Sequence, residues 1–376
     1  MRPLRIAICT AHFHPVVGGS ERSLLRLAAY WTTQGHNCFV LTRPVPGAPT
    51  HETVEGVHIH RVIRTASLGP LFGATFIASL GLQLLWRARQ YDVIVAGQLP
   101  WESVATGMVS RLIGRPSLAF AASTGPLGDV QQIIAARGSA ILRRLVTSNS
   151  RFVALSEQGR NELRTLGCRD DTIVRFTNGV DLDQFVPVAD NDAERGRSVL
   201  FLSRLVSAKN PHVLLRAWKL LNGDGRYRLL MGGGGPLGDE LHQTVRREDL
   251  RNVEFLGQVS DVPNVHRRAG VYVLPSPSEG CPNALLEAMA SGLCPVATRV
   301  PGIVDVVEDE ENGLLLDHDD ERQLAEALGR VLEDEPLRRR LSAAARTHIE
   351  AHHDLKKIAA AYLDLFQELV SVPSER

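Results

Sequence analysis

Two glutamates eight positions apart have a spacing and a setting that could serve chemistry. Glu279 lies in a loop after the β-branched run 271–274, which predicts a buried strand. Glu287 is the only charge in the apolar segment that follows, where Pro282 suits the first turn of a helix and Gly292 the residue just past its end. A helix this apolar is expected inside a domain, where a carboxylate needs hydrogen-bond donors.

The position of this pair indicates a ligand site. In open α/β sheets, ligands bind at the carboxyl ends of strands and at helix N-termini. Two acids that flank such a helix could hold the hydroxyl groups of a ligand whose phosphate lies at the helix end. The alternative is structural: Glu287 points into solvent, and Glu279 is an acid that the helix dipole favours.

Two cations lie at comparable positions earlier in the chain. Arg204 follows the predicted strand 198–202, and Lys209 lies just before the next predicted helix, 211–221. Together they could neutralise a diphosphate without a metal ion, the arginine by forked hydrogen bonds and the lysine as a point charge. Taken singly, each is more often a solvated surface residue.

Two glycine-rich loops also follow predicted strands. Gly18 and Gly19 precede a helix that Ser20 is expected to cap, and Gly232 and Gly233 begin a run of four glycines. Glycine lets backbone N–H groups approach a phosphate closely, although a tight turn is the simpler explanation. No Gly-x-Gly-x-x-Gly follows the first strand, which argues against a nicotinamide oxidoreductase.

Taken together, these segments resemble the retaining glycosyltransferases of family 4. The main motif is Glu-x7-Glu within Ser-x-x-Glu-Gly-x-Pro-Asn-x-Leu-Leu-Glu-Ala-Met-Ala at 276–290. The resemblance continues in Pro-x-x-Gly-Gly-x-Glu-Arg at 15–22 and Ser-Arg-Leu-x-x-x-Lys at 203–209, and it spans nearly the whole chain. It implies an α/β protein of the GT-B fold, in which two Rossmann-like domains with parallel sheets face each other across a cleft.

The resemblance also implies a role for each motif residue. Glu279 would hold the sugar hydroxyls of a nucleoside-diphosphate sugar, Arg204 and Lys209 would counter the leaving diphosphate, and these three form the expected catalytic set. Glu287 would hold the ribose hydroxyls. The other donor-binding residues that the resemblance implies are Gly18, Gly19, Gly232, Gly233, Val259, Gly280, Cys281, Pro282, Asn283 and Ala284.

The expected reaction moves a hexosyl group with retention from a UDP- or GDP-linked sugar to a hydroxyl acceptor, in the synthesis of cell-envelope polysaccharide or glycolipid. No cofactor and no metal ion are expected, and we expect no Asp-x-Asp motif at a strand end of the second domain. Three alternatives stay open: a natural-product glycosyltransferase, a GT-B sugar-nucleotide epimerase and a non-catalytic nucleotide-sugar-binding partner subunit. The products separate these classes. A glycosyltransferase releases free nucleotide in the presence of an acceptor, an epimerase yields isomerised donor, and a partner subunit binds the donor without turnover.

The acceptor side departs from the family pattern. Many relatives carry a histidine after the strand that corresponds to 117–121, where this chain reads Ala-Ala-Ser-Thr-Gly. Ser123, Thr124 or a backbone carbonyl could take its place, and Asp129 is a further candidate for contact with the acceptor. The acceptor itself could be a carbohydrate, a lipid-linked intermediate or a small molecule.

Length and alternation of elements predict two domains. A chain of 376 residues is longer than a single core usually grows. We expect a first domain at 1–187, completed by a C-terminal helix at about 355–376, and a donor-binding domain at 188–354, with a polar linker at 187–197. Strands of the first domain are expected at 5–9, 38–42, 57–62, 93–96, 117–121, 152–154 and 172–176. Its first helix is expected to begin at Ser20, and its other helices are expected at about 71–89, 102–113, 140–147 and 157–166.

The charges are unevenly distributed. The formal net charge is zero, but residues 1–180 hold 19 basic and 10 acidic side chains. This excess indicates an anionic partner such as phospholipid or a phosphorylated acceptor, whereas no aromatic-interleaved basic cluster points to nucleic acid. The apolar stretch 68–86 is interpreted as a helix that covers a sheet and partly faces a membrane, rather than as a membrane span. Residues 137–151 are interpreted as a basic amphipathic segment that lies against a membrane or an anionic acceptor, with a surface helix of solvated arginines as the alternative.

The five cysteines are scattered and none is spaced as a metal ligand, so reduced thiols in a cytoplasm are expected. Residues 1–9 are too short and charged for a signal peptide and predict the first strand. The expected location is therefore cytoplasmic, with peripheral association at the inner face of an anionic cell membrane.

Overall fold

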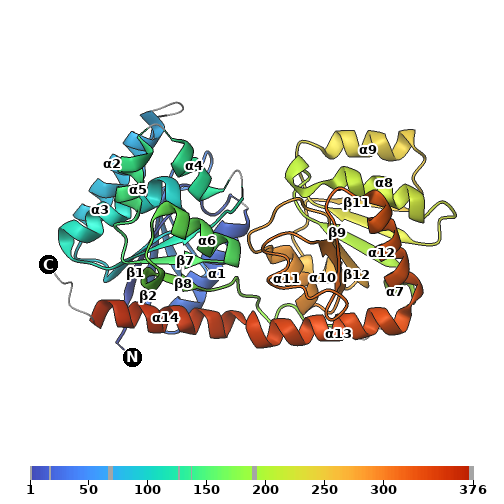
Figure 1. The fold of residues 1–376 in the computed structure, drawn as a ribbon. Coiled ribbons are helices and arrows are strands. Elements are labelled where there is room, and N and C mark those ends of the chain that lie inside the picture. Colours follow the sequence, from blue (N-terminus) through green and yellow to red (C-terminus); the bar gives the residue numbers. More distant parts are fainter. Residues whose placement is uncertain are drawn as a thin grey trace. The chain divides into compact units, whose positions relative to one another are not determined.

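The computed structural model describes residues 2–16, 18–66, 71–125, 128–136, 138–188 and 193–371. The chain forms two α/β units, Met1–Gly179 with Leu355–Arg376 and Val180–Asp354 (Figure 1). The division falls eight residues before the predicted boundary at 187. The reason is Phe185, which is buried in the core of the second unit, where its carbonyl accepts a 2.6 Å hydrogen bond from Arg346.

The sheet of the first unit has the order β3-β4-β2-β1-β5-β6-β7-β8. All neighbouring pairs are parallel except the hairpin of β3 and β4, which turns through Glu55 and Gly56 at positive φ. The edge strand β3 was not predicted because its His-Glu-Thr-Val sequence is polar and half-exposed. The strands are β1 (Arg5–Cys9), β2 (Asn37–Thr42), β3 (His51–Val54), β4 (Val57–Arg61), β5 (Val93–Ala96), β6 (Ser117–Ala121), β7 (Arg151–Ala154) and β8 (Ile173–Arg175).

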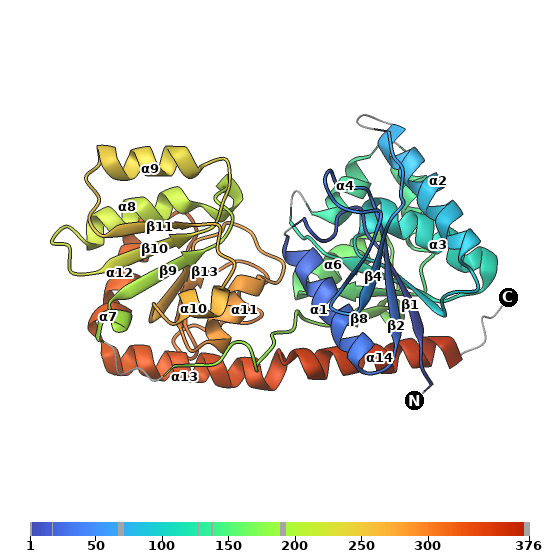
Figure 2. The same cartoon turned by 180° about the vertical axis from the view of Figure 1, so that it is seen from behind.

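Helices cover both faces of this sheet. One face packs against α1 (Gly19–Thr33) and α14 (Leu355–Ser371), which Figure 2 shows side by side. Trp31 on α1 donates a 2.9 Å hydrogen bond to the carbonyl of Ala359, so the last helix joins the first unit as predicted. The other face packs against α2 (Leu71–Trp86), α3 (Val104–Ile113), α4 (Asp129–Ala135), α5 (Ser139–Val146) and α6 (Glu157–Leu166).

Three local predictions for this unit were wrong. Ser20 does not cap α1, because the helix begins one residue earlier and Gly18 is its N-cap. The helix expected from Glu102 is preceded by the π-helical turn η1 (Leu99–Ser103), and the short helix α4 was not predicted. The 3₁₀ turn η2 (Asp170–Thr172) precedes β8.

The six strands of the second unit are all parallel, in the order β11-β10-β9-β12-β13-β14. They are β9 (Ser198–Leu202), β10 (Arg228–Gly232), β11 (Val253–Gly257), β12 (Val271–Leu274), β13 (Cys294–Thr298) and β14 (Leu314–Leu316). The helical elements are α7 (Ala193–Gly196), η3 (Ser207–Lys209), α8 (Pro211–Leu221), α9 (Gly238–Arg247), α10 (Val262–His266), α11 (Asn283–Ala290), α12 (Glu321–Glu333) and α13 (Glu335–His352). The predicted linker at 187–197 lies partly outside the described residues, and it includes α7.

The strand order places a switch point in the second sheet between β9 and β12. From β9 the chain proceeds outward through β10 and β11, and from β12 it proceeds outward the other way. In doubly wound sheets, ligands bind beside the carboxyl ends of the strands at this point. The predicted cations Arg204 and Lys209 follow β9, and the predicted acid Glu279 follows β12. These charged residues therefore lie at the same end of two adjacent strands.

Candidate functional site

An ion pair joins the two strand ends at the switch point. Lys209, at the end of η3, places its Nζ 2.5 Å from Oε1 of Glu279 in the loop after β12. The two side chains are 20% and 8% exposed. A charge-assisted hydrogen bond of this kind fixes both groups at the carboxyl edge of the sheet. The sequence indicated both residues but not that they pair.

Arg204 offers a second, uncommitted cation at this edge. It lies two residues past the end of β9 and is exposed to solvent. Within residues 193–371, no carboxylate pairs with its guanidinium. Its backbone is fixed on both sides, since Ser203 N donates to the carbonyl of Gly232 at 3.1 Å and Leu205 N to that of Gly234 at 2.9 Å. The guanidinium is therefore available to an anionic ligand.

The glycine run after β10 packs directly against this arginine loop. A Cβ on Gly233, whose φ is 130°, would lie 1.9 Å from the carbonyl oxygen of Ser203. A Cβ on Gly232 would lie 3.1 Å from the Val259 side chain, so these two predicted donor-binding residues are neighbours. Close packing of two loops is enough to require glycine at 233.

Glu287 is buried in α11. Only 2% of its surface is exposed, so the alternative that it points into solvent is wrong. Tyr272 on β12 lies near both acids of the motif: burial raises the pKa of its hydroxyl, and the charges of Glu279 and Glu287 raise this pKa further. The hydroxyl of Tyr272 donates to the carbonyl of Leu202 at 3.2 Å, which links β12 to the end of β9.

The residues between the two acids form the start of α11. Pro282 is the N-cap rather than part of the first turn, and Gly292 lies past the end with φ 75°, as predicted. A Cβ on Gly302 would lie 2.3 Å from the carbonyl oxygen of Gly280, so the loop carrying Glu279 is held against a second loop. Of the other predicted donor residues here, three are partly buried at the helix start: Cys281, Asn283 and Ala284.

The carboxyl edge of the first sheet carries two buried acids that the sequence analysis did not connect. Glu102 in η1 is 1% exposed and its Oε1 accepts a 2.8 Å hydrogen bond from Ala11 N, in the loop after β1. Burial raises the pKa of Glu102 to about 7, and the charge of Asp129 contributes to this rise. Their signal in the sequence is that they are two of only three acids between Glu55 and Glu157.

Asp129 serves its own loop. It is 4% exposed, and its oxygens accept hydrogen bonds from Ala122 N at 3.0 Å and from Ser123 Oγ at 2.6 Å. Burial raises the pKa of Asp129 as well. It therefore positions the exposed Ser123, while Thr124 Oγ1 is buried without a partner among the described residues. Gly18 and Gly19 lie at the start of α1, in the connection that follows β1.

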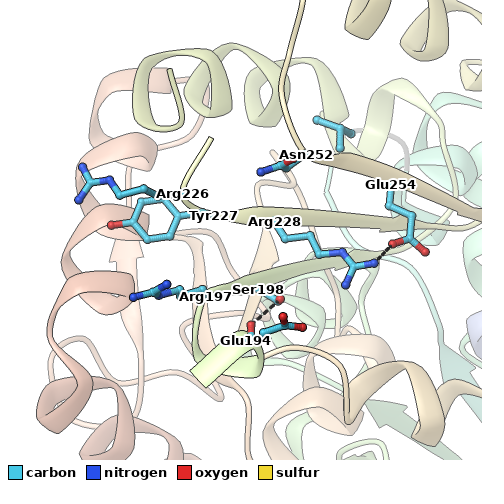
Figure 3. Close-up of a pocket in the computed structure, with 9 residues that line it drawn as sticks. Glu194, Arg197, Ser198, Arg226, Tyr227, Arg228, Asn252 and Glu254 are labelled. Carbon is cyan, nitrogen blue, oxygen red and sulfur yellow. Dashed lines mark hydrogen bonds and ion pairs between the residues drawn. The ribbon is translucent and has the colours of Figure 1, made fainter. Parts of the chain in front are cut away.

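A cavity of about 390 Å³ lies at the opposite edge of the second sheet, at the amino ends of β9, β10 and β11 (Figure 3). Arg197, Arg226 and Arg228 line it, and Arg228 and Glu254 form an ion pair. None of the predicted site residues lines this cavity.

One expectation about metals was wrong. An Asp-x-Asp sequence does follow a strand of the second unit, since Asp317 and Asp319 come directly after the edge strand β14. Both are exposed, and Asp319 pairs with Arg216 at 3.4 Å. Across the described residues, no three histidine, cysteine or acidic side chains gather as a metal site.

Comparison with known proteins gives matches over both units. The family model described as Glycosyltransferase Family 4 matches residues 17–184, and the model described as Glycosyl transferases group 1 matches residues 187–348.

Curated relatives include two named D-inositol 3-phosphate glycosyltransferase. The one from Salinispora arenicola is 26% identical over 98% of this chain and 93% of its own length. The one from Corynebacterium urealyticum is 31% identical, but the match spans about half of each protein, 54% of this chain and 53% of the relative. Among solved structures, HepE of Anabaena in complex with UDP and glucose has a TM-score of 0.78 at 20% identity, over 97% of this chain and 100% of that one.

Proposed function

Because the chain belongs to the family 4 type of glycosyltransferases and has their GT-B fold, we propose that its donor is a nucleoside-diphosphate sugar, UDP- or GDP-linked. A hexosyl group would pass to a hydroxyl acceptor with retention of the anomeric configuration. The observation that carries this proposal is the Lys209–Glu279 ion pair beside the exposed Arg204, at the switch point of the second sheet.

The charges at this edge suit the leaving group. As the bond between sugar and diphosphate breaks, negative charge develops on the diphosphate, and preorganised cations stabilise it most in a partly enclosed site. Arg204 can bind two phosphate oxygens at once, and Lys209, on the same connection after β9, can contribute a point charge. Glu279 would contact the sugar, and the buried Glu287 the ribose.

We propose that these cations make a divalent metal unnecessary. Activity is then expected to persist in EDTA, measured as release of free nucleotide in the presence of acceptor. Complete loss in EDTA with recovery on addition of Mg²⁺ would contradict this part of the proposal.

The acceptor is proposed to be a carbohydrate or a lipid-linked hydroxyl compound in glycan or glycolipid synthesis. The relatives named above support a sugar or polyol acceptor, because they are named for D-inositol 3-phosphate. Ser123, which Asp129 holds in place, is the candidate contact on the first unit.

The test is a thermal-shift screen of the full chain with UDP, GDP and ADP and with their sugars. A ligand that binds only the native state raises its melting temperature, so one nucleoside diphosphate and its sugar are expected to stand out. Incubating that donor with candidate acceptors should release free nucleotide and a glycosylated product. Isomerised donor would instead identify an epimerase, and binding without turnover under all conditions a partner subunit.

A further inference from the structure

The exposed positions of α2 are all apolar. Its exposed positions include Leu71, Ala74, Ala78, Leu82 and Trp86, which follow one another at three or four residues. Leu82 and Trp86 are 67% and 75% exposed. Surface helices normally present charged and polar residues to water. The sixteen residues of α2 include no charged side chain at all.

The neighbouring helices extend this surface. α3 packs against α2 and exposes Met108 and Leu112, and α5 packs against α3 and exposes Ile141 (Figure 1). Leu112 and Ile141 are 72% and 70% exposed. We call these exposed side chains of α2, α3 and α5 the apolar face. Exposed apolar side chains that are grouped on neighbouring helices in this way indicate an interaction site.

Every exposed charged side chain that the structure describes between residues 56 and 156 is positive. Residues 56–156 contain ten arginines, no lysine and three acids. The acids are Asp92, Glu102 and Asp129, and each is at most 4% exposed. Arg111 lies on α3 between the exposed Met108 and Leu112 and is itself exposed.

We propose that the apolar face docks the protein on an anionic phospholipid bilayer. Leucine, methionine and tryptophan side chains would enter the boundary between headgroups and acyl chains, and the arginines would contact lipid phosphates. A second copy of the chain fits less well, because a symmetric contact through this face would place the same arginines opposite one another. The dock is peripheral, since no helix among the described residues has the length and apolarity to cross a membrane.

This surface shares no residue with the proposed donor site, so the two proposals can fail separately. The experiment is co-sedimentation of the full chain with vesicles of phosphatidylglycerol, compared with vesicles of phosphatidylcholine. The wild-type protein is expected to bind the first and not the second, and to dissociate as salt screens the arginines.

Two variants test the two chemical components. Leu82→Ser combined with Trp86→Ser is expected to weaken binding about tenfold or more, because each side chain loses its burial in lipid. Arg111→Gln is expected to weaken it about fivefold, the effect of one basic residue near an anionic surface. The matched controls are Leu220→Ser and Arg246→Gln on the second unit, both exposed positions that should leave binding unchanged.

Three results would overturn the proposal: no binding to phosphatidylglycerol at low salt, equal binding to both vesicle types, or equal binding by the Leu82→Ser/Trp86→Ser variant. A wild-type dimer in solution that this variant dissociates would assign the apolar face to self-association instead. Unchanged melting temperatures and unchanged nucleotide binding would show that the variants are folded and that the donor site is unaffected.

Discussion

At the carboxyl edge of the second sheet, charged side chains pair with one another and reach the solvent, whereas at the same edge of the first sheet they turn inward to the backbone. Lys209 and Glu279 pair across two strand ends beside the exposed Arg204. Glu102 and Asp129 are buried and accept hydrogen bonds from the loops that follow β1 and β6. Two sheets of similar topology thus use the same edge differently.

The difference has an energetic origin. Side chains that pair at a partly exposed edge can exchange their partners for a ligand at modest cost, so such an edge suits recognition of a charged substrate. A buried acid can leave its backbone partners only by exposing unsatisfied N–H groups, so it holds loops in place. We therefore expect substitutions in the second unit to change donor binding and turnover, and substitutions of the first unit's acids to change stability and its pH dependence.

The strongest expected effect is that of Glu279→Ala. Losing a preorganised charge at the reacting centre is expected to lower turnover by about 10²–10³-fold. Steady-state release of nucleotide measures this change. Glu240→Ala, at an exposed acid on α9, is the matched control and should behave as wild type. Wild-type turnover in a folded Glu279→Ala protein would remove this residue from the site.

Next in size is the pH response of the first unit. Burial holds the pKa of Glu102 at about 7, above the ordinary 4.5. Between these values the folded protein keeps a proton that the unfolded chain has released, so stability is full below pH 4.5 and is lost as pH rises to 7. The loss amounts to about 3 kcal/mol, an order-of-magnitude figure.

Glu102→Gln cannot ionise, so this part of the stability curve should flatten. Urea unfolding at pH 5.0, 6.0 and 7.5 measures the difference between the two proteins. Identical pH dependence in wild type and Glu102→Gln would show that the acid is not buried in the way described. The donor affinity of the variant should stay at the wild-type value.

A smaller effect is expected for Arg204→Ala. The variant loses charge-assisted hydrogen bonds to phosphate and should bind nucleoside diphosphate about 10–100-fold more weakly, as measured by calorimetry. Arg197→Ala, at an exposed arginine of the cavity in Figure 3, is the matched control and should bind normally. The reverse pattern would move the diphosphate to the opposite edge of the sheet.

The last expected effect is the acid response of His266 in the second unit. Burial lowers its pKa to about 3, and its Nδ1 lies 2.9 Å from Ser291 Oγ at the end of α11. Below pH 6.5 the unfolded chain binds a proton that the folded protein does not, so stability falls by up to about 1.4 kcal/mol per pH unit as pH drops toward 3. This trend is opposite in sign to that of Glu102.

His266→Leu should remove this acid sensitivity while leaving a folded protein. Urea unfolding at pH 6.5, 5.5 and 4.5 measures it. A wild-type slope in the variant would assign the acid sensitivity of this unit to other groups.

The sequence predicted the strands and helices whose residues follow a clear hydrophobic pattern. The buried strands β6, β9 and β12 have the predicted bounds because their apolar runs are continuous. The edge strand β3 was missed because half of its side chains face solvent, and the turn η1 because a helical pattern does not distinguish π from α geometry. Pro282 and Gly292 located α11 to within one residue.

The sequence predicted which residues belong to the candidate site where a motif contains them. It did not predict the contacts between residues that are distant in the sequence. Glu279, Glu287, Arg204 and Lys209 could be named from the sequence. The pairing of Lys209 with Glu279 joins positions 70 residues apart, and only the strand order brings them together. Glu102 was predicted only as the first residue of a helix, where an acid is ordinary. Its burial and its hydrogen bond from Ala11 N depend on the loop after β1, which lies 91 residues away in the sequence.

The most direct test of the account is a crystal structure of the full chain with UDP bound. We predict that the diphosphate lies at the carboxyl ends of β9 and β12, within hydrogen-bonding distance of Arg204, with the ribose hydroxyls at Glu287. A diphosphate bound instead among Arg197, Arg226 and Arg228 at the amino edge of the sheet, with Arg204 and Glu287 making no contact to it, would contradict the account.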